Sequence, residues 1–289
     1  MIDVGRVSRA RWWPATAALV LGTAALGAAL LVPLAFSDPN GVDPYVIRLS
    51  VTALLLLGAA WLWARAAGVR ALLLALVAIT SSFTVLSAAP QVLVAVFGDR
   101  VASGDAQVLW ASLAQLVVTA MLLLAGARFL PPAERPVLRL WRFGWAALAV
   151  SVGGSLLLVL AGLALPASLL GRYGLQPVAL IRDMPWLGPA NALQALSQEA
   201  QFRGMLMGGL ERVMGRNWAN LGQAVFFGLA HLAVNYQGPV APFVPVTIAV
   251  GLVLGWIVQR TGSIWPAVII HAVADIAITA VVLPGLYGF

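Results

Sequence analysis

The chain has 289 residues, of which 62% are hydrophobic and 9% are charged, and its mean hydropathy is +0.96. Because soluble domains carry about 25% charged residues, this composition excludes an ordinary water-soluble protein and indicates a polytopic membrane protein. All 17 basic residues are arginines dispersed between apolar segments, against 10 acidic residues, so we interpret them as topology signals and expect no nucleic-acid partner.

Apolar stretches predict about nine membrane-spanning helices along the sequence. About 20 apolar residues cross a bilayer as a helix, so the predicted fold class is all-α, a single polytopic transmembrane bundle. In chain order the predicted spans cover residues 12–36, 45–63, 71–97, 108–130, 143–165, 188–210, 218–236, 240–258 and 264–283. The longest connection, residues 166–187, has a composition that suits a segment lying along the lipid headgroups.

The arginines also predict the orientation. With the N-terminus in the cytoplasm, twelve arginines fall on inner connections and four on outer ones, as the positive-inside rule requires. The lipid bilayer is the first expected partner, and the expected location is a cytoplasmic membrane of bacterial type.

Small and amide residues inside the spans predict contacts between helices. The glycine pairs 204/208 and 251/255 have the G-x-x-x-G spacing that lets two helices approach closely. We interpret Gln115 and Gln194 as hydrogen-bond partners between helices.

Ionisable residues inside the spans are concentrated in the last third of the chain. Burying each of these side chains in a bilayer costs on the order of 3 kcal/mol, so we expect each of them to have a structural or functional role. By the boundaries above, these residues are Glu199, Arg203, His231, His271 and Asp275, and they include both histidines of the protein.

Their spacing predicts three short polar stripes, because residues four apart share one face of a helix. The pairs are Glu199 with Arg203, Phe227 with His231, and His271 with Asp275. The economical arrangement directs all three stripes into one cavity. The alternative is that Glu199 and Arg203 only neutralise each other's charge, while the histidines cap or cross-link helices. This alternative explains each pair separately but does not explain why all the pairs lie in adjacent spans. With these boundaries His231 lies nearer the outer face than His271, so tilted or shifted helices are needed to bring them together.

Two carboxylates and two imidazoles in a pocket of low dielectric predict water activation with stabilisation of an oxyanion. Neutral histidines and carboxylates are also competent zinc ligands, but no H-E-x-x-H helix occurs and the chain has no cysteine. We predict no cofactor, with a zinc site as an open alternative.

Three motifs resemble one family. They are QEAQFRG at residues 198–204, FGLAH at 227–231, and GSIWP at 262–266 leading to HAVAD at 271–275. In order and spacing they resemble E-E-x-x-x-R, F-x-x-x-H and H-x-x-x-[ND] of the CPBP intramembrane endopeptidases, the glutamic-type group that contains CAAX prenyl protease 2 and the bacteriocin-processing ABI proteins. We accordingly divide the bundle into N-terminal helices without a motif (1–187) and a CPBP-like core (188–289).

The resemblance implies a helical bundle with a conical, partly hydrated cavity, and it implies roles for the motif residues. His231 would help to prepare the attacking water, and Phe227 would pack against it. His271 and Asp275 would line the oxyanion site, where Asp275 donates if protonated and orients His271 if ionised. Glu199 would pair with Arg203 in a mainly structural role.

Gln198 departs from the family pattern, because it occupies the position of the glutamate that acts as the base. An amide cannot accept a proton from water as a carboxylate does. Three hypotheses follow. Glu199 takes over as the base after a helix rearrangement; the protein binds a membrane helix or lipidated peptide without cutting it; or Gln198 orients a water that His231 alone deprotonates.

The leading functional hypothesis is an intramembrane endopeptidase-like protein that hydrolyses or binds a membrane-associated peptide, of the prenylated CAAX type or the bacteriocin type. A catalytically silent pseudoprotease that acts as a binding, immunity or chaperone-like partner is the first alternative, and a small-solute transporter is the second. The oligomeric state is left open.

Overall fold

The computed structural model describes the helices from the second predicted span onward. The described residues are 17, 44–63, 65, 69–97, 104–136, 144–163, 176–231 and 244–278. They are helical apart from short turns, and no strand occurs among them. The predicted all-α class is confirmed for this part of the chain.

Every predicted span from residue 45 onward overlaps a helix, and the span at 12–36 lies outside the described residues. The helices are α2 (Pro44–Trp63), α3 (Arg70–Phe97), α4 (Gly104–Phe129), η4 (Pro132–Glu134), α5 (Trp145–Leu163), α6 (Pro177–Asp183), α7 (Leu187–Glu199), η6 (Ala200–Leu206), α8 (Met207–Met214), α9 (Arg216–Ala230), α10 (Val244–Thr261) and α11 (Trp265–Ala277). By length and composition, two described helices could cross a membrane, Ala106–Phe129 and Val244–Thr261. The count of nine spans stays a prediction.

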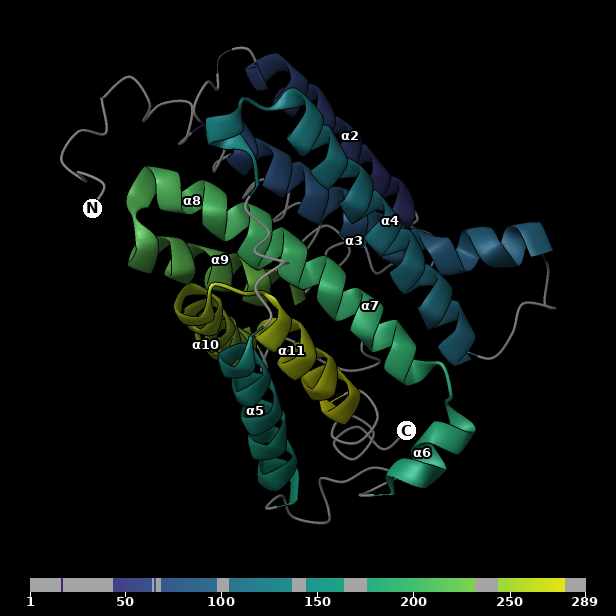
Figure 1. Cartoon of the computed structure of the whole chain (residues 1–289). Helices are drawn as coiled ribbons and strands as arrows, with labels where there is room; N and C mark the ends of the chain where they lie inside the picture. Colours follow the sequence, from purple (N-terminus) through teal and green to yellow (C-terminus); the bar gives the residue numbers. More distant parts are fainter. Residues whose placement is uncertain are drawn as a thin grey trace.

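One continuous rod, formed by α7, η6 and α8, runs through the centre of the bundle (Figure 1). Its backbone stays helical where the three segments join, at Ala200 and at Met207. The middle segment η6 is a π-helix, whose wider turn changes the direction of the side chains that follow it. Such turns are frequent at functional sites.

Helices pack on both sides of the rod. On one side α3 contacts η6 and α8, and α4 contacts α7, while α2 lies against α3. On the other side α9 contacts η6 and α8, α11 contacts α7, and α10 and α5 lie against these helices (Figure 1). The helices before residue 187 therefore pack directly against those that carry the motifs.

Two glycines with positive φ make the tight connections of the motif region. Gly215, with φ of 80°, joins α8 to α9, and Gly262, with φ of 66°, follows the end of α10. This left-handed conformation costs glycine little because it has no Cβ. Pro266 then lies in the first turn of α11, where its missing N–H is tolerated.

The predicted glycine contacts are confirmed on α10, and the one predicted for Gly208 on the rod is wrong. A Cβ at Gly251 would lie 3.1 Å from Cα of Ala224, so α10 approaches the backbone of α9 closely. Gly208 faces open space, and the neighbouring Gly209 makes the contact instead, since a Cβ there would lie 3.1 Å from Cα of Leu72 in α3. The π-turn before α8 changes which glycine faces α3.

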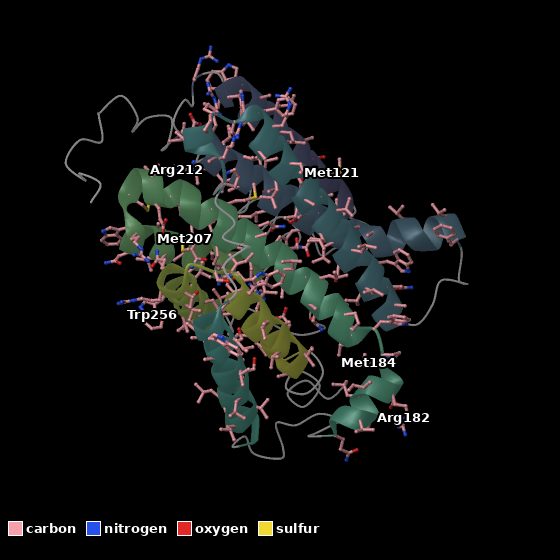
Figure 2. The ribbon with its side chains drawn as sticks, viewed as in Figure 1. Met121, Arg182, Met184, Met207, Arg212 and Trp256 are labelled. Atoms are coloured by element: carbon pink, nitrogen blue, oxygen red, sulfur yellow. The ribbon has the colours of Figure 1, made fainter. Side chains whose placement is uncertain are left out.

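Large apolar side chains cover the outside of the bundle. Met121 of α4 is 63% exposed and Trp256 of α10 is 53% exposed, and both lie on the outer surface (Figure 2). Polar side chains, in contrast, are buried along the rod, among them Ser197, Gln201 and Arg203. An apolar exterior around a polar interior is the arrangement that lipid contact favours.

Candidate active site

The three predicted stripes meet at the centre of the bundle, around the junction of α7 and η6. Glu199 ends α7, Arg203 lies in η6, His231 follows the last residue of α9, and His271 lies in α11. These side chains are buried. The structure thus brings all three pairs into one cluster and does not leave them as separate helix contacts.

Glu199 is the centre of this cluster. Its Oε1 atom accepts a hydrogen bond from Nη1 of Arg203 at 2.7 Å and another from Nδ1 of His271 at 2.7 Å. Its Oε2 atom is buried and has no hydrogen-bond partner among the described residues. One carboxylate oxygen therefore links the π-helix to α11.

The hydrogen bond to Glu199 defines the orientation of the His271 ring. Because Oε1 also accepts from a guanidinium, which has no acceptor, we assign the proton of this bond to Nδ1. In the neutral ring the lone pair is then on Nε2. This atom lies 3.4 Å from Oδ2 of Asp275, the third predicted pair, and the contact is an ion pair only when the ring is protonated.

His231 has the same tautomer for a different reason. Its Nδ1 lies 2.7 Å from the carbonyl oxygen of Phe227, and a carbonyl only accepts. Nδ1 is therefore the donor, and the neutral ring has its lone pair on Nε2. Both histidines of the chain are thus held through Nδ1 with Nε2 directed away from the holding group.

The ring of Phe227 connects the parts of the cluster. Its centroid lies 4.5 Å from that of His231 and 5.3 Å from that of His271, both edge-on. The guanidinium of Arg203 lies 4.3 Å from the same ring, and Phe202 of η6 packs at 5.2 Å. The predicted packing of Phe227 against His231 is confirmed, and both histidines lie within reach of one aromatic ring despite their different predicted depths.

Gln198 lies beside the cluster. It is 2% exposed, and its Oε1 atom has no hydrogen-bond partner among the described residues. Among the described residues, the hydrogen bonds with Arg203 and His271 are made by Glu199.

Two polar residues of α9 support Arg203 and were not singled out from the sequence. Nη2 of Arg203 lies 3.3 Å from the carbonyl oxygen of Gly251 in α10, and Nε2 of Gln223 donates to the same oxygen at 2.9 Å. Asn220 donates to the carbonyl oxygen of Leu252 at 3.0 Å. The signal was present, because residues 220, 223, 227 and 231 follow one face of a helix.

A further polar cluster, also unforeseen, joins α4 to the rod. Gln201 donates to Thr119 at 2.6 Å and to Ser197 at 3.0 Å, and the two hydroxyls are 2.7 Å apart. Gln115, predicted to bond another helix, is fully buried and has no partner for either amide atom among the described residues, so that prediction is wrong.

The described residues contain no group of three His, Asp or Glu side chains in the arrangement that a metal ion needs. Glu199 and His271 are hydrogen bonded to each other, and Asp275 lies beside the second ring nitrogen of His271.

Comparison with known proteins gives a family match for the part of the chain that carries the motifs. Residues 180–277 match the family model described as type II CAAX prenyl endopeptidase Rce1-like, which confirms the resemblance predicted from the three motifs. The matched segment runs from α6 to the end of α11 and contains every site residue named above. The family is an integral membrane family, which supports a membrane location for this chain. No curated protein and no solved structure gives a match.

Proposed function

We propose that this chain, whose residues 180–277 match the Rce1-like type II CAAX prenyl endopeptidases, is an intramembrane endopeptidase-like protein that binds a membrane-associated peptide and hydrolyses it. The observation that carries the proposal is the convergence of Glu199, Arg203, His231 and His271 from separate helices into one buried cluster. Burying so many ionisable groups in a membrane protein costs free energy, and apolar side chains would be sufficient to pack a helix bundle.

Hydrolysis requires groups that the cluster contains. Water adds to the carbonyl carbon of the peptide and loses a proton, so the carbonyl oxygen carries negative charge in the tetrahedral intermediate. The C=O bond then re-forms, the C–N bond breaks, and the amine leaves with a proton. A neutral imidazole with its lone pair on Nε2 accepts the proton from water, and the resulting imidazolium donates it to the amine. His231 and His271 are the candidates, and Asp275 lies beside the second of them.

The contacts of Glu199 indicate whether it can replace the family's first glutamate, whose position is occupied by Gln198 in this chain. Because Oε1 already accepts from Arg203 and His271, we assign Glu199 to orienting His271 and not to the role of the base. A carboxylate on Nδ1 fixes the tautomer of an imidazole and stabilises its protonated form, as in carboxylate–histidine pairs generally. This assignment leaves the proton of the water to a histidine, with the Gln198 amide available to orient the water.

Gln198 also favours a second candidate function, a silent relative that binds a membrane helix or lipidated peptide and does not cut it. The cluster would then be retained for its packing and its polar contacts. No observation favours the small-solute transporter.

We also propose the finer features that the sequence predicts. These are an N-terminus in the cytoplasm, a bacterial cytoplasmic membrane, and a motif-bearing core over residues 188–289 supported by the helices of residues 1–187. A lipidated or otherwise membrane-associated peptide is the proposed partner.

The test is a quantitative map of new protein termini in membranes of cells that express the wild type, Gln198→Glu or His231→Ala. Gln194→Glu is the matched control, because it makes the same change one turn earlier on α7. Termini that are present with the wild type and absent with His231→Ala support a protease that works without the family's first glutamate. Termini that appear only with Gln198→Glu support the silent relative, and none in any strain would contradict hydrolysis.

A further inference from the structure

We propose that Asn220 and Gln223, together called the α9 amide clamp, are positioning residues that set the orientation of His271 through Arg203 and Glu199. The consequence for catalysis rests on the proposed function, whereas the consequence for the geometry of His271 does not. No motif described above contains either residue.

The clamp binds α10 through main-chain carbonyl groups. Nε2 of Gln223 donates to the carbonyl oxygen of Gly251 at 2.9 Å and to Oδ1 of Asn220 at 2.8 Å. Nδ2 of Asn220 donates to the carbonyl oxygen of Leu252 at 3.0 Å. Gln223 is fully buried and Asn220 is 9% exposed, so little water competes for these bonds.

Arg203 shares an acceptor with the clamp. Its Nη2 lies 3.3 Å from the same Gly251 oxygen that Gln223 binds, while its Nη1 lies 2.7 Å from Glu199 Oε1. That oxygen also accepts from Nδ1 of His271. An unbroken series of hydrogen bonds therefore leads from the clamp, across one carbonyl of α10, to the imidazole.

The glycines of α10 make room for this arrangement. A Cβ at Gly255 would overlap the amide of Asn220 and would lie 2.6 Å from Nε2 of Gln223. A Cβ at Gly251 would lie 3.2 Å from Cδ1 of Phe227, the ring that contacts both histidines. The position of the Gly251 carbonyl thus depends on the two amides and on the close approach that the glycines allow.

The position of that carbonyl affects one histidine more than the other. Arg203 is held between Gly251 and Glu199, so a shift of α10 changes the place of its guanidinium and hence the bond from His271 to Glu199. The Nδ1 bond of His231, in contrast, is made within its own chain segment, to the Phe227 carbonyl. Loss of the clamp should therefore disturb His271 selectively.

The experiment uses the two histidines of the chain as probes. The full-length protein, labelled with ¹⁵N-histidine and reconstituted in lipid nanodiscs, gives two imidazole spin systems, which His231→Asn assigns. The variants are Gln223→Met, which keeps the side-chain length and removes the donor, and Gly255→Ala, which displaces the clamp and keeps both amides. Gln194→Met on α7 is the matched control.

We expect the Nδ1–H resonance of His271 to shift and to exchange faster with water in both variants, while that of His231 and both resonances of the control stay in place. Folded variants in which neither histidine changes, or in which both change equally, would overturn the proposal, because the clamp would then be general packing. If the wild type cleaves a peptide, Gln223→Met should lower kcat about tenfold with KM unchanged, the size expected for a slight misplacement of a catalytic group. If the wild type cleaves nothing, the proposed function fails. The imidazole resonances of His271 and His231 still test whether the α9 amide clamp orients His271.

Discussion

Nδ1 of His271 lies 2.7 Å from Oε1 of Glu199, although 72 residues separate the two in the chain. The bond joins α11 to the end of α7, and the same oxygen binds Arg203. Three charged or chargeable side chains, those of Glu199, Arg203 and His271, therefore depend on one oxygen atom.

Glu199→Gln should destabilise the protein by about 3–5 kcal/mol, because the buried guanidinium of Arg203 loses its counter-charge. It should also abolish any hydrolysis, since His271 loses the carboxylate that stabilises its protonated form. Unfolding in detergent with increasing denaturant measures the first effect. The control is Glu199→Gln combined with Arg203→Met, which removes both charges and should recover most of the stability. Unchanged unfolding of the single variant would contradict the prediction.

Phe227→Ala should cost about 3–5 kcal/mol, the usual range for truncating a buried phenylalanine. Its ring contacts both histidines, Phe202 and the Arg203 guanidinium, so the cavity would open inside the cluster. The neighbouring Phe226 is only partly buried, and Phe226→Ala should cost clearly less. Equal losses for the two variants, measured by thermal unfolding, would show that the ring has no special part in the cluster.

Gln115→Leu should stabilise the protein by about 1–3 kcal/mol, since the substitution removes a buried amide whose two atoms have no partner among the described residues. Gln201→Leu should have the opposite effect, because the Gln201 amide donates to Thr119 and Ser197. The midpoints of thermal unfolding of the two variants are compared with that of the wild type. A lower midpoint for Gln115→Leu would mean that the amide has a bound partner.

Gly208→Ala should stabilise the rod by about 0.4–1 kcal/mol, because a Cβ there meets open space and alanine restricts the unfolded chain. Gly209→Ala should destabilise it, since the added Cβ would press against the backbone of Leu72 at 3.1 Å. The comparison of these adjacent substitutions by denaturant unfolding needs no activity. Two changes of the same sign would contradict the packing of α8 on α3.

The sequence was sufficient for the parts of the site that depend on one helix at a time. The pair of Glu199 and Arg203 follows from a spacing of four residues, and so does the contact between Phe227 and His231. The approximate places of the helices from residue 45 onward also followed, because long apolar runs are needed to cross a bilayer, whereas their ends differ by several residues and α6 was not predicted. The convergence of the three pairs was predicted from the cost of ionisable groups in lipid, which needs no knowledge of the packing.

The sequence was insufficient to predict contacts between residues of different helices. The bond from His271 to Glu199, the shared Gly251 carbonyl and the cluster around Gln201 depend on helix rotation and tilt, which periodicity does not determine. The unpartnered amide of Gln115 illustrates the same limit of periodicity, since residues facing a neighbouring helix need not face a partner on it.

The π-turn after Glu199 gives the central rod one residue more than an α-helix would use over the same rise. Since successive residues of an α-helix differ by about 100° around its axis, this single residue sets the angle between two halves of the rod. The first half presents Glu199 to α11, and the second presents Gly209 to α3. A deletion of one residue from 205–206 would keep every motif intact yet turn α8 away from its neighbour. Insertions and deletions here therefore show whether a related chain packs its rod on α3 in the same way, which the motif residues do not.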